Sequence, residues 1–306
     1  MEGFQVLKWP IPWVLAYFCI MVASWSLLGR IYPVLRFLCK YRSQRSLISR
    51  CGKGSWAVVT GASYGIGLGF AKVLAAKGFN IVLIARSGEI LRKIAAELET
   101  KHGILTRVIV FDFSHAGSDY EGFYESLVRQ LNDLDVSFLV NNVGWGTDIL
   151  YEKQELEAIT KLLELDVWPQ LFLSRWGLSR MEKRLSQSVI LSLSSLACVF
   201  PLAACALYSA VKEYDDFLSR ALSNEKSLHN VHLLSLRPGF VDTPLAANSR
   251  DKFLEISIEE CAEAVLEHVS TASYTSGHWK NRLMRFIFFF IPESLWATMS
   301  LKKYKV

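Results

Sequence analysis

Short apolar segments rich in β-branched residues alternate with amphipathic segments through the middle of the chain. Apolar runs of about four to eight residues are typical of buried strands, and a spacing near 3.6 residues is typical of helices. The segment Gly67–Lys77 has helical spacing and stops at Gly78, a residue type that commonly follows a helix. The strand-like segments are Trp56–Thr60, Asn80–Ala85, Arg107–Phe111, Ser137–Asn141, Ser188–Ser194 and Val231–Leu236. This alternation predicts an α/β fold with a single doubly wound parallel sheet.

The N-terminal end of the chain has a different pattern. Pro10–Leu28 contains no charged residue and approaches the roughly 20 residues with which a helix crosses a bilayer. Basic residues follow from Arg30 to Lys53, and such residues prefer the cytosolic side of a membrane. We therefore expect a transmembrane anchor at residues 1–30 and a basic linker at residues 31–53, with everything after Arg30 in the cytosol. A cleaved signal peptide is disfavoured because there is no clear small-residue cleavage site, and a buried core helix stays open.

The C-terminal end is apolar again, but less regular. We expect the catalytic domain at residues 54–282 and a separate tail at residues 283–306. The uncharged run Phe286–Pro292 in this tail is too short to span a bilayer. The tail is therefore predicted to be an interfacial segment with a basic end, rather than a second membrane crossing.

Charge and composition exclude several other classes of function. The formal net charge is +5, and much of the excess lies between Arg30 and Lys53, so it indicates a membrane flank rather than a nucleic-acid groove. The six cysteines and six histidines show no spacing typical of metal ligands. We expect no metal and no nucleic acid, and reduced thiols as in a cytosolic domain.

A glycine-rich turn follows the first predicted strand. Glycines at such a turn let the backbone approach a pyrophosphate, and the helix that follows directs its N-terminus at it. A bland glycine-rich loop is the alternative if this turn is considered alone. The turn contains Gly61, Ser63, Tyr64, Gly65, Ile66 and Gly67.

The end of the second predicted strand bears on the choice of cofactor. Dinucleotide folds that prefer NAD place an acidic residue there for the ribose 2′-hydroxyl, but this chain has Ala85 followed by Arg86. A guanidinium group can bind a 2′-phosphate through two hydrogen bonds, so Arg86 favours NADP(H). A solvated arginine at a strand end is the alternative.

Three residues near the fifth and sixth strands form the candidate catalytic set. Tyr208 and Lys212 are four residues apart and so lie on one helix face, where the ammonium group is expected to lower the pKa of the phenol. Ser195 follows the strand Ser188–Ser194 and is placed to donate a hydrogen bond to a substrate carbonyl.

Together these motifs resemble the short-chain dehydrogenase/reductase family, which has a Rossmann-type sheet. The spacing GxxxGxG, the serine, and the YxxxK pair all match the family pattern. The valine in Asn141-Asn142-Val143-Gly144 is similar to the subgroup that contains 17β-hydroxysteroid dehydrogenase types 3 and 12 and the very-long-chain 3-oxoacyl-CoA reductases. The resemblance implies that Tyr208 and Lys212 also contact the cofactor. Further cofactor contacts that it implies are Asp112, Phe113, Asn141, Pro238, Gly239 and Thr243.

One position departs from the family pattern. Where the resemblance implies an asparagine that holds a water in a proton relay, motif order gives Asp166. An ionised aspartate accepts hydrogen bonds but cannot donate them, and near Tyr208 it would raise the pKa of the phenol. Either Asp166 alters the catalytic site, or it lies away from it.

The resemblance implies an NADPH-dependent ketone reductase of the endoplasmic reticulum membrane with its catalytic domain in the cytosol. The favoured reaction is reduction of a 3-oxoacyl-CoA during very-long-chain fatty-acid elongation, and homodimers are common in the family. A 17β-hydroxysteroid dehydrogenase, or one for another steroid or lipid ketone, is the alternative within the family. A catalytically weak membrane scaffold that retains the fold is the alternative from another class.

Overall fold

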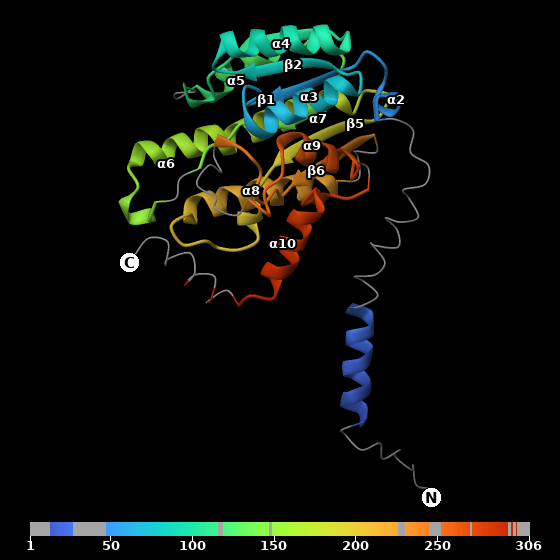
Figure 1. Cartoon of the computed structure of the whole chain (residues 1–306), viewed down its shortest axis with the longest axis vertical. Coiled ribbons are helices and arrows are strands. Elements are labelled where there is room, and N and C mark those ends of the chain that lie inside the picture. Colours follow the sequence, from blue (N-terminus) through green and yellow to red (C-terminus); the bar gives the residue numbers. More distant parts are fainter. Residues whose placement is uncertain are drawn as a thin grey trace, which may run out of the picture. The chain divides into compact units, whose positions relative to one another are not determined.

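The structure is a computed structural model that describes residues 13–26, 47–115, 119–146, 149–225, 230–244, 252–269 and 271–292, with Leu295 and Thr298. The chain divides into two units, Met1–Arg45 and Ser46–Val306. In the first unit, residues 13–26 form a helix whose side chains are exposed. The second unit holds the sheet and its covering helices (Figure 1).

Seven parallel strands form the sheet in the order β3-β2-β1-β4-β5-β6-β7. Both directions of the order start from the central pair β1 and β4, so the prediction of a doubly wound parallel sheet is confirmed. The strands are β1 (Trp56–Thr60), β2 (Asn80–Ala85), β3 (Thr106–Val110), β4 (Val136–Asn141), β5 (Ser188–Leu193), β6 (Val231–Leu236) and β7 (Tyr274–Thr275).

Helices cover both faces of this sheet, and each face has its own apolar core. One core combines strand residues with α3 (Gly65–Ala76), α4 (Gly88–His102) and α9 (Ile258–Leu266). The other combines them with α5 (Tyr120–Arg129) and α7 (Trp168–Met181). Both faces are thus sealed, which leaves the ends of the strands for a ligand site.

Two further helices position the candidate site. α8 (Ala206–Ser223) packs on β5 and β6, and it carries the candidate Tyr208 and Lys212. α6 (Leu156–Leu162) continues through a single π-helical turn, η3 (Leu163–Val167), into α7. Such π-helical turns are frequent at functional sites, and this one holds Asp166.

The strands agree with the sequence prediction to within one residue at each end. Only β7 was not predicted, because two residues carry no periodicity. Within the segment predicted to be a basic linker, residues 47–51 form the short helix α2 (Leu47–Cys51), whose end residues are buried.

The two terminal segments are described only in part. The predicted anchor Pro10–Leu28 is helical at residues 13–26, and its remaining residues lie outside the described part. Among the described residues, no helix has the length and hydropathy that a membrane crossing requires. The predicted tail begins inside α10 (Trp279–Phe289), and apart from Leu295 and Thr298 its residues after Pro292 lie outside the described part.

Candidate functional site

The glycine turn connects β1 to the N-terminus of α3 with very close contacts. Gly61 and Gly65 have φ angles of 64° and 57°, which lie in the left-handed region that favours glycine. A Cβ atom on Gly61 would lie 2.8 Å from Asn142 Nδ2, so the turn has no room for a side chain there. Ser63, Tyr64 and Ile66 complete the turn, with Tyr64 as the residue before α3. The backbone is therefore built for close approach of a ligand to a helix N-terminus, as a pyrophosphate requires.

Asn142 fastens this turn to the end of β4. Its Nδ2 donates to the carbonyl oxygens of Thr60 at 2.8 Å and of Gly61 at 3.3 Å, and its backbone N–H donates to Thr60 Oγ1. Asn141, the predicted cofactor contact, instead donates from Nδ2 to Ser174 Oγ inside the protein. In this motif it is therefore Asn142, and not Asn141, that holds the glycine turn in place.

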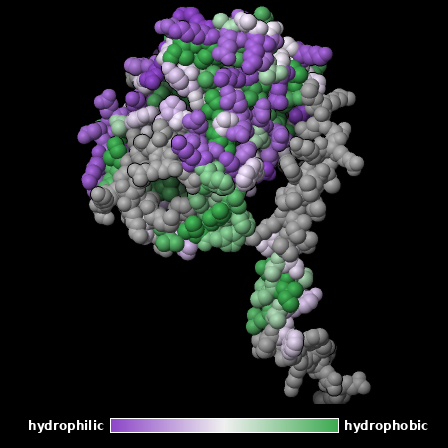
Figure 2. All heavy atoms as spheres, viewed as in Figure 1, coloured by the Kyte–Doolittle hydropathy of each residue, from purple (hydrophilic) through white to green (hydrophobic). Residues whose placement is uncertain are grey.

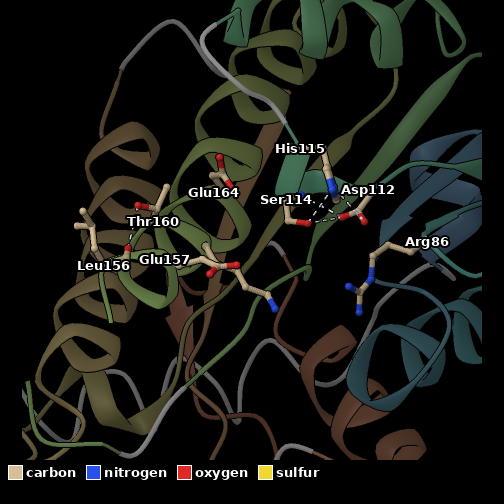
Figure 3. A pocket seen from close by; sticks show the side chains of 9 residues that line it. Arg86, Asp112, Ser114, His115, Leu156, Glu157, Thr160 and Glu164 are labelled. Atoms are coloured by element: carbon tan, nitrogen blue, oxygen red, sulfur yellow. Dashed lines mark hydrogen bonds and ion pairs between the residues drawn. The ribbon is translucent and has the colours of Figure 1, made fainter. Parts of the chain in front are cut away.

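Arg86 and Asp112, from the ends of β2 and β3, line one cavity of about 580 Å³ (Figure 3). The other residues that line it are Ser114, His115, Leu156, Glu157, Thr160, Lys161 and Glu164. Burial raises the pKa of Asp112, but hydrogen bonds from Ser114 and the nearby His115 and Arg86 outweigh it, so the net pKa is lowered. Asp112 is therefore a fixed acceptor near Arg86, and Lys161 adds a second cation to the lining of the cavity. The cavity suits a phosphorylated nucleoside.

The sequence did not single out Lys161, because it belongs to no motif and comes from α6. Its Nζ lies 4.9 Å from the centroid of the Trp145 ring. Phe113, another predicted cofactor contact, is buried and packs its ring against Phe111 and Tyr124. Its side chain belongs to the core rather than to the cavity.

The structure brings Ser195, Tyr208 and Lys212 together. Ser195 lies two residues after the end of β5, and its hydroxyl hydrogen-bonds to the phenol of Tyr208, while its Oγ also accepts from the Ala197 N–H at 3.1 Å. Lys212 Nζ lies 5.9 Å from the centroid of the Tyr208 ring. Both residues lie on α8 one turn apart, as their spacing predicted.

The expected lowering of the pKa of Tyr208 is not found. Burial raises the pKa above its ordinary value, and Asp166 and Asp215 raise it further. Lys212 and the hydrogen bond with Ser195 do lower it, but by less than the opposing effects together. The sequence prediction considered the ammonium alone, whereas the phenol also faces burial and two carboxyl groups. Tyr208 is therefore held in its protonated form at neutral pH.

Asp166 lies inside the site and contacts the candidate lysine directly. Lys212 Nζ is 2.7 Å from Asp166 Oδ1 and 3.0 Å from Asp215 Oδ2, and it donates to the Leu193 carbonyl oxygen at 3.1 Å. The exposed fractions of Lys212, Asp166 and Asp215 are 5%, 2% and 1%. The alternative that Asp166 lies away from the site is therefore wrong. Asp215 was missed, since only the structure shows that it is buried.

Gly144 makes this ion pair sterically feasible. A Cβ atom on Gly144 would lie 2.5 Å from Asp166 Oδ1 and 3.3 Å from Lys212 Nζ. The other Asp166 oxygen, Oδ2, accepts from the Trp145 backbone N–H at 2.9 Å. The last residue of the NNVG motif therefore leaves space for Asp166, which the following residue holds in place.

The loop after β6 is anchored beneath the site. Arg237 is held by the buried Asp216, and the carbonyl oxygen of Pro238 accepts from the Leu196 N–H at 2.9 Å, next to Ser195. A Cβ atom on Gly239 would lie 3.1 Å from Leu196 Cδ1. The Thr243 side chain lies close to Gly65 of the glycine turn. Pro238, Gly239 and Thr243 therefore lie around the same end of the sheet as the catalytic set and the turn.

Comparisons with known proteins agree with this geometry. A family model described as short chain dehydrogenase matches residues 55–253. A very-long-chain 3-oxoacyl-CoA reductase of Anas platyrhynchos is 33% identical over 83% of this chain and 81% of its own. The human inactive hydroxysteroid dehydrogenase-like protein 1 is 32% identical over 86% of this chain and 79% of its own. A solved structure of a 7beta-hydroxysteroid dehydrogenase matches with a TM-score of 0.72 at 19% identity, over 84% of this chain and 99% of that one.

Proposed function

The chain belongs to the short-chain dehydrogenase family, and from this premise we propose that it reduces 3-oxoacyl-CoA to 3-hydroxyacyl-CoA with NADPH. Membership makes it an oxidoreductase that acts on the CH–OH/C=O pair. The observation that carries the proposal is the convergence of Ser195, Tyr208 and Lys212 at the end of the sheet that also carries the glycine turn. The relatives named very-long-chain 3-oxoacyl-CoA reductase support the substrate class.

When bound, NADPH would supply the hydride for this reduction. The residues around the cavity fit the cofactor, because Arg86 and Lys161 are cations suited to a 2′-phosphate. Arg86 also stands directly after β2, where a fold that prefers NAD would carry an acidic residue. Ser195 donates a hydrogen bond to the substrate carbonyl oxygen, and Tyr208 gives its phenolic proton to that oxygen. The raised pKa of Tyr208 keeps this proton in place at neutral pH, which suits reduction better than oxidation.

We further propose that the protein acts on the endoplasmic reticulum membrane. The exposed apolar helix at residues 13–26 and the basic residues after it fit an anchor. A second apolar surface lies on α10 (Figure 2), where Trp279, Leu283 and Phe286 share one helix face and are exposed, as is Phe290 directly after the helix. Lys280, Arg282 and Arg285 in the same helix suit anionic lipid headgroups.

A catalytically weak scaffold is the second candidate. It is favoured by the two carboxyl groups around Lys212 and by the relative named inactive. The retained Tyr208 and Ser195 favour the enzyme.

The decisive experiment is NADPH oxidation by membranes that contain the full chain. A 3-oxoacyl-CoA, 3-ketosphinganine and a steroid ketone are compared side by side, with NADH as the second cofactor and Tyr208→Phe as the matched inactive protein. We expect oxidation of NADPH with the 3-oxoacyl-CoA only. Turnover of the steroid ketone instead would mean that the substrate is a steroid and not an acyl-CoA. Rates equal to those of Tyr208→Phe for every ketone would favour the scaffold.

The membrane proposal is tested separately. Alkaline carbonate extraction should leave the full-length chain in the membrane pellet, and protease added to sealed microsomes should digest the domain without detergent. Recovery of the intact chain in the supernatant would contradict the anchor. Complete protection from protease would contradict the cytosolic orientation.

A further inference from the structure

The ammonium group of Lys212 is enclosed by oxygen acceptors of the protein, two through hydrogen bonds and Asp166 through an ion pair. An ammonium group has three N–H donors and no acceptor. Three oxygen atoms lie within 3.1 Å of Lys212 Nζ: the Leu193 carbonyl oxygen, Asp166 Oδ1 and Asp215 Oδ2. A cofactor hydroxyl can therefore receive a hydrogen bond from Lys212 only if one of these three acceptors gives way.

Asp215 is the least firmly held of the three. The Leu193 oxygen belongs to β5, whose position the sheet fixes. Asp166 is closer to Nζ and is also held by the Trp145 N–H. Asp215 has the longer ion-pair contact, and its second oxygen, Oδ1, lacks a hydrogen-bond partner, whereas the second oxygen of Asp166 accepts from the Trp145 N–H.

The cluster also contains an excess of negative charge. Lys212 contributes one positive charge, whereas Asp166 and Asp215 contribute two negative charges when both are ionised. The other titratable or charged groups that act on these residues are Tyr208 and Tyr214, which are neutral phenols, and Asp216, whose charge faces Arg220 and Arg237. A buried charge without a partner is costly, and uptake of one proton by the two carboxyl groups removes it.

The pKa values of both acids shift in the direction that this charge balance requires. The net pKa of Asp215 is raised to about 7, because burial raises it most and Asp166 adds to the rise, while Lys212 opposes it. Burial likewise raises the pKa of Asp166. Because the two acids interact through one lysine, they titrate as a pair.

We propose that Asp215 is a positioning residue for Lys212: when ionised it occupies one N–H donor, and it releases that donor when the Asp166–Asp215 pair takes up a proton. This inference rests on the proposed function in one respect, namely that Lys212 contacts the nicotinamide cofactor. In the protonated cluster, Lys212 has a donor available for a cofactor hydroxyl. NADPH therefore binds more tightly on the acidic side of neutrality than on the alkaline side.

The first test detects the proton itself in the full chain without ligand. Infrared spectra between pH 5 and pH 9 should show the C=O stretch of a buried protonated carboxyl group that disappears as the pH rises through about 7. Asp215→Asn and Asp166→Asn should each lose this band, because either change leaves one carboxylate for one ammonium. Glu213→Gln is the matched control and should retain it, since Glu213 lies on the same helix but contacts Arg220 rather than Lys212.

The second test measures the dissociation constant of NADPH at pH 6 and pH 8 by nicotinamide fluorescence. The fraction of a group with a pKa of about 7 that is protonated falls about tenfold over this range, so affinity for the wild-type protein should fall about tenfold as well. The affinity of Asp215→Asn for NADPH should not show this tenfold fall. The titration of the cofactor phosphate is common to both proteins and cancels in the comparison.

The outcomes separate the two proposals. A wild-type protein without the protonated-carboxyl band refutes the shared proton even if Asp215→Asn does not fold. Identical pH profiles of NADPH affinity in wild type and Asp215→Asn, or no NADPH binding at all, refute the positioning role. A protein that shows both expected results yet reduces no ketone refutes the proposed function and leaves the role of Asp215 intact.

Discussion

Two buried ionic clusters on α8 involve adjacent residues, yet they are built in opposite ways. In the first, the carboxylate of Asp216 accepts from Arg237 Nε and Nη2, Arg220 Nε and Ser235 Oγ, each at 2.6 Å. In the second, the ammonium group of Lys212 faces the two carboxyl groups of Asp166 and Asp215. The first cluster gives one anion two cations, and the second gives one cation two anions.

The difference shows how neighbours determine the chemistry of identical side chains. Burial raises the pKa of Asp216, but the hydrogen bonds from Arg237 and Ser235 outweigh it and leave a net lowered value. For Asp215, burial prevails and the pKa rises to about 7. A carboxylate such as Asp216, whose oxygens accept hydrogen bonds from two cations, is suited to hold a loop in place. A carboxylate such as Asp215, which shares one cation with a second acid, can exchange a proton near neutral pH.

The largest effect on activity is expected for Tyr208→Phe, which tests whether the second cluster serves chemistry. The change removes the transferable proton, so kcat should fall by about 10² to 10⁴. Thermal stability and NADPH affinity should change little. A variant that keeps more than a few per cent of the wild-type rate would show that Tyr208 is not the proton donor.

Asp216→Ala tests whether the first cluster serves the fold. It leaves Arg237 buried without its bidentate acceptor, so the free energy of unfolding should fall by about 3–5 kcal/mol. Urea denaturation followed by circular dichroism measures this loss. A loss below about 1 kcal/mol would mean that the arginines find other acceptors and that the contrast between the clusters is not one of stability.

The pH dependence of stability should distinguish the two acids. Asp215 binds protons more tightly in the folded state, so its stabilising contribution is complete below pH 3.8 and is lost as the pH rises through about 7. Asp216 has a lowered pKa, so its contribution is complete above pH 3.8 and is lost only at lower pH. Between about pH 4 and pH 7, the titration of Asp215 makes the free energy of unfolding of the wild type fall by up to about 1.4 kcal/mol per pH unit. The Asp215→Asn variant should lack this fall. Glu213→Gln should follow the wild-type curve, and parallel curves for all three proteins would contradict the difference.

The smallest effect is expected for Asp166→Asn. It removes one of the two anions beside Lys212 while keeping the shape of the side chain, so kcat at neutral pH should rise or stay unchanged. The measurement is the steady-state rate with saturating NADPH and 3-oxoacyl-CoA. A large fall would show that the carboxylate has a role of its own in the reaction.

The strands of the sheet could be predicted from the sequence, because buried parallel strands consist of local runs of apolar residues. β1, β2 and β6 have the predicted bounds, and the glycine turn and the YxxxK pair lie where the order of strands and helices in the sequence predicted them. These features depend on residues that are close in sequence or belong to a known motif. Local patterns could therefore identify them.

The charge balance of the site could not be read in the same way. Asp166 was identified by its position in the motif order, but its contact with Lys212 depends on the approach of η3 to α8 and on the absence of a side chain at Gly144. Asp215 looked like any polar residue on a helix, since its burial results from packing between segments distant in the chain. The expected pKa of Tyr208 was wrong for this reason.

The spacing of these residues along α8 also limits which changes of length the helix can accept. Successive residues of an α-helix point about 100° apart, so one inserted or deleted residue turns everything that follows by that angle. An insertion between Tyr208 and Lys212 would carry Lys212 away from Asp166 and Asp216 away from Arg237, and it would separate the phenol from the ammonium group. A substitution in α8, by contrast, keeps the register of the helix, so single side chains can be exchanged one at a time. The number of residues between Tyr208 and Asp216 is fixed by both clusters at once.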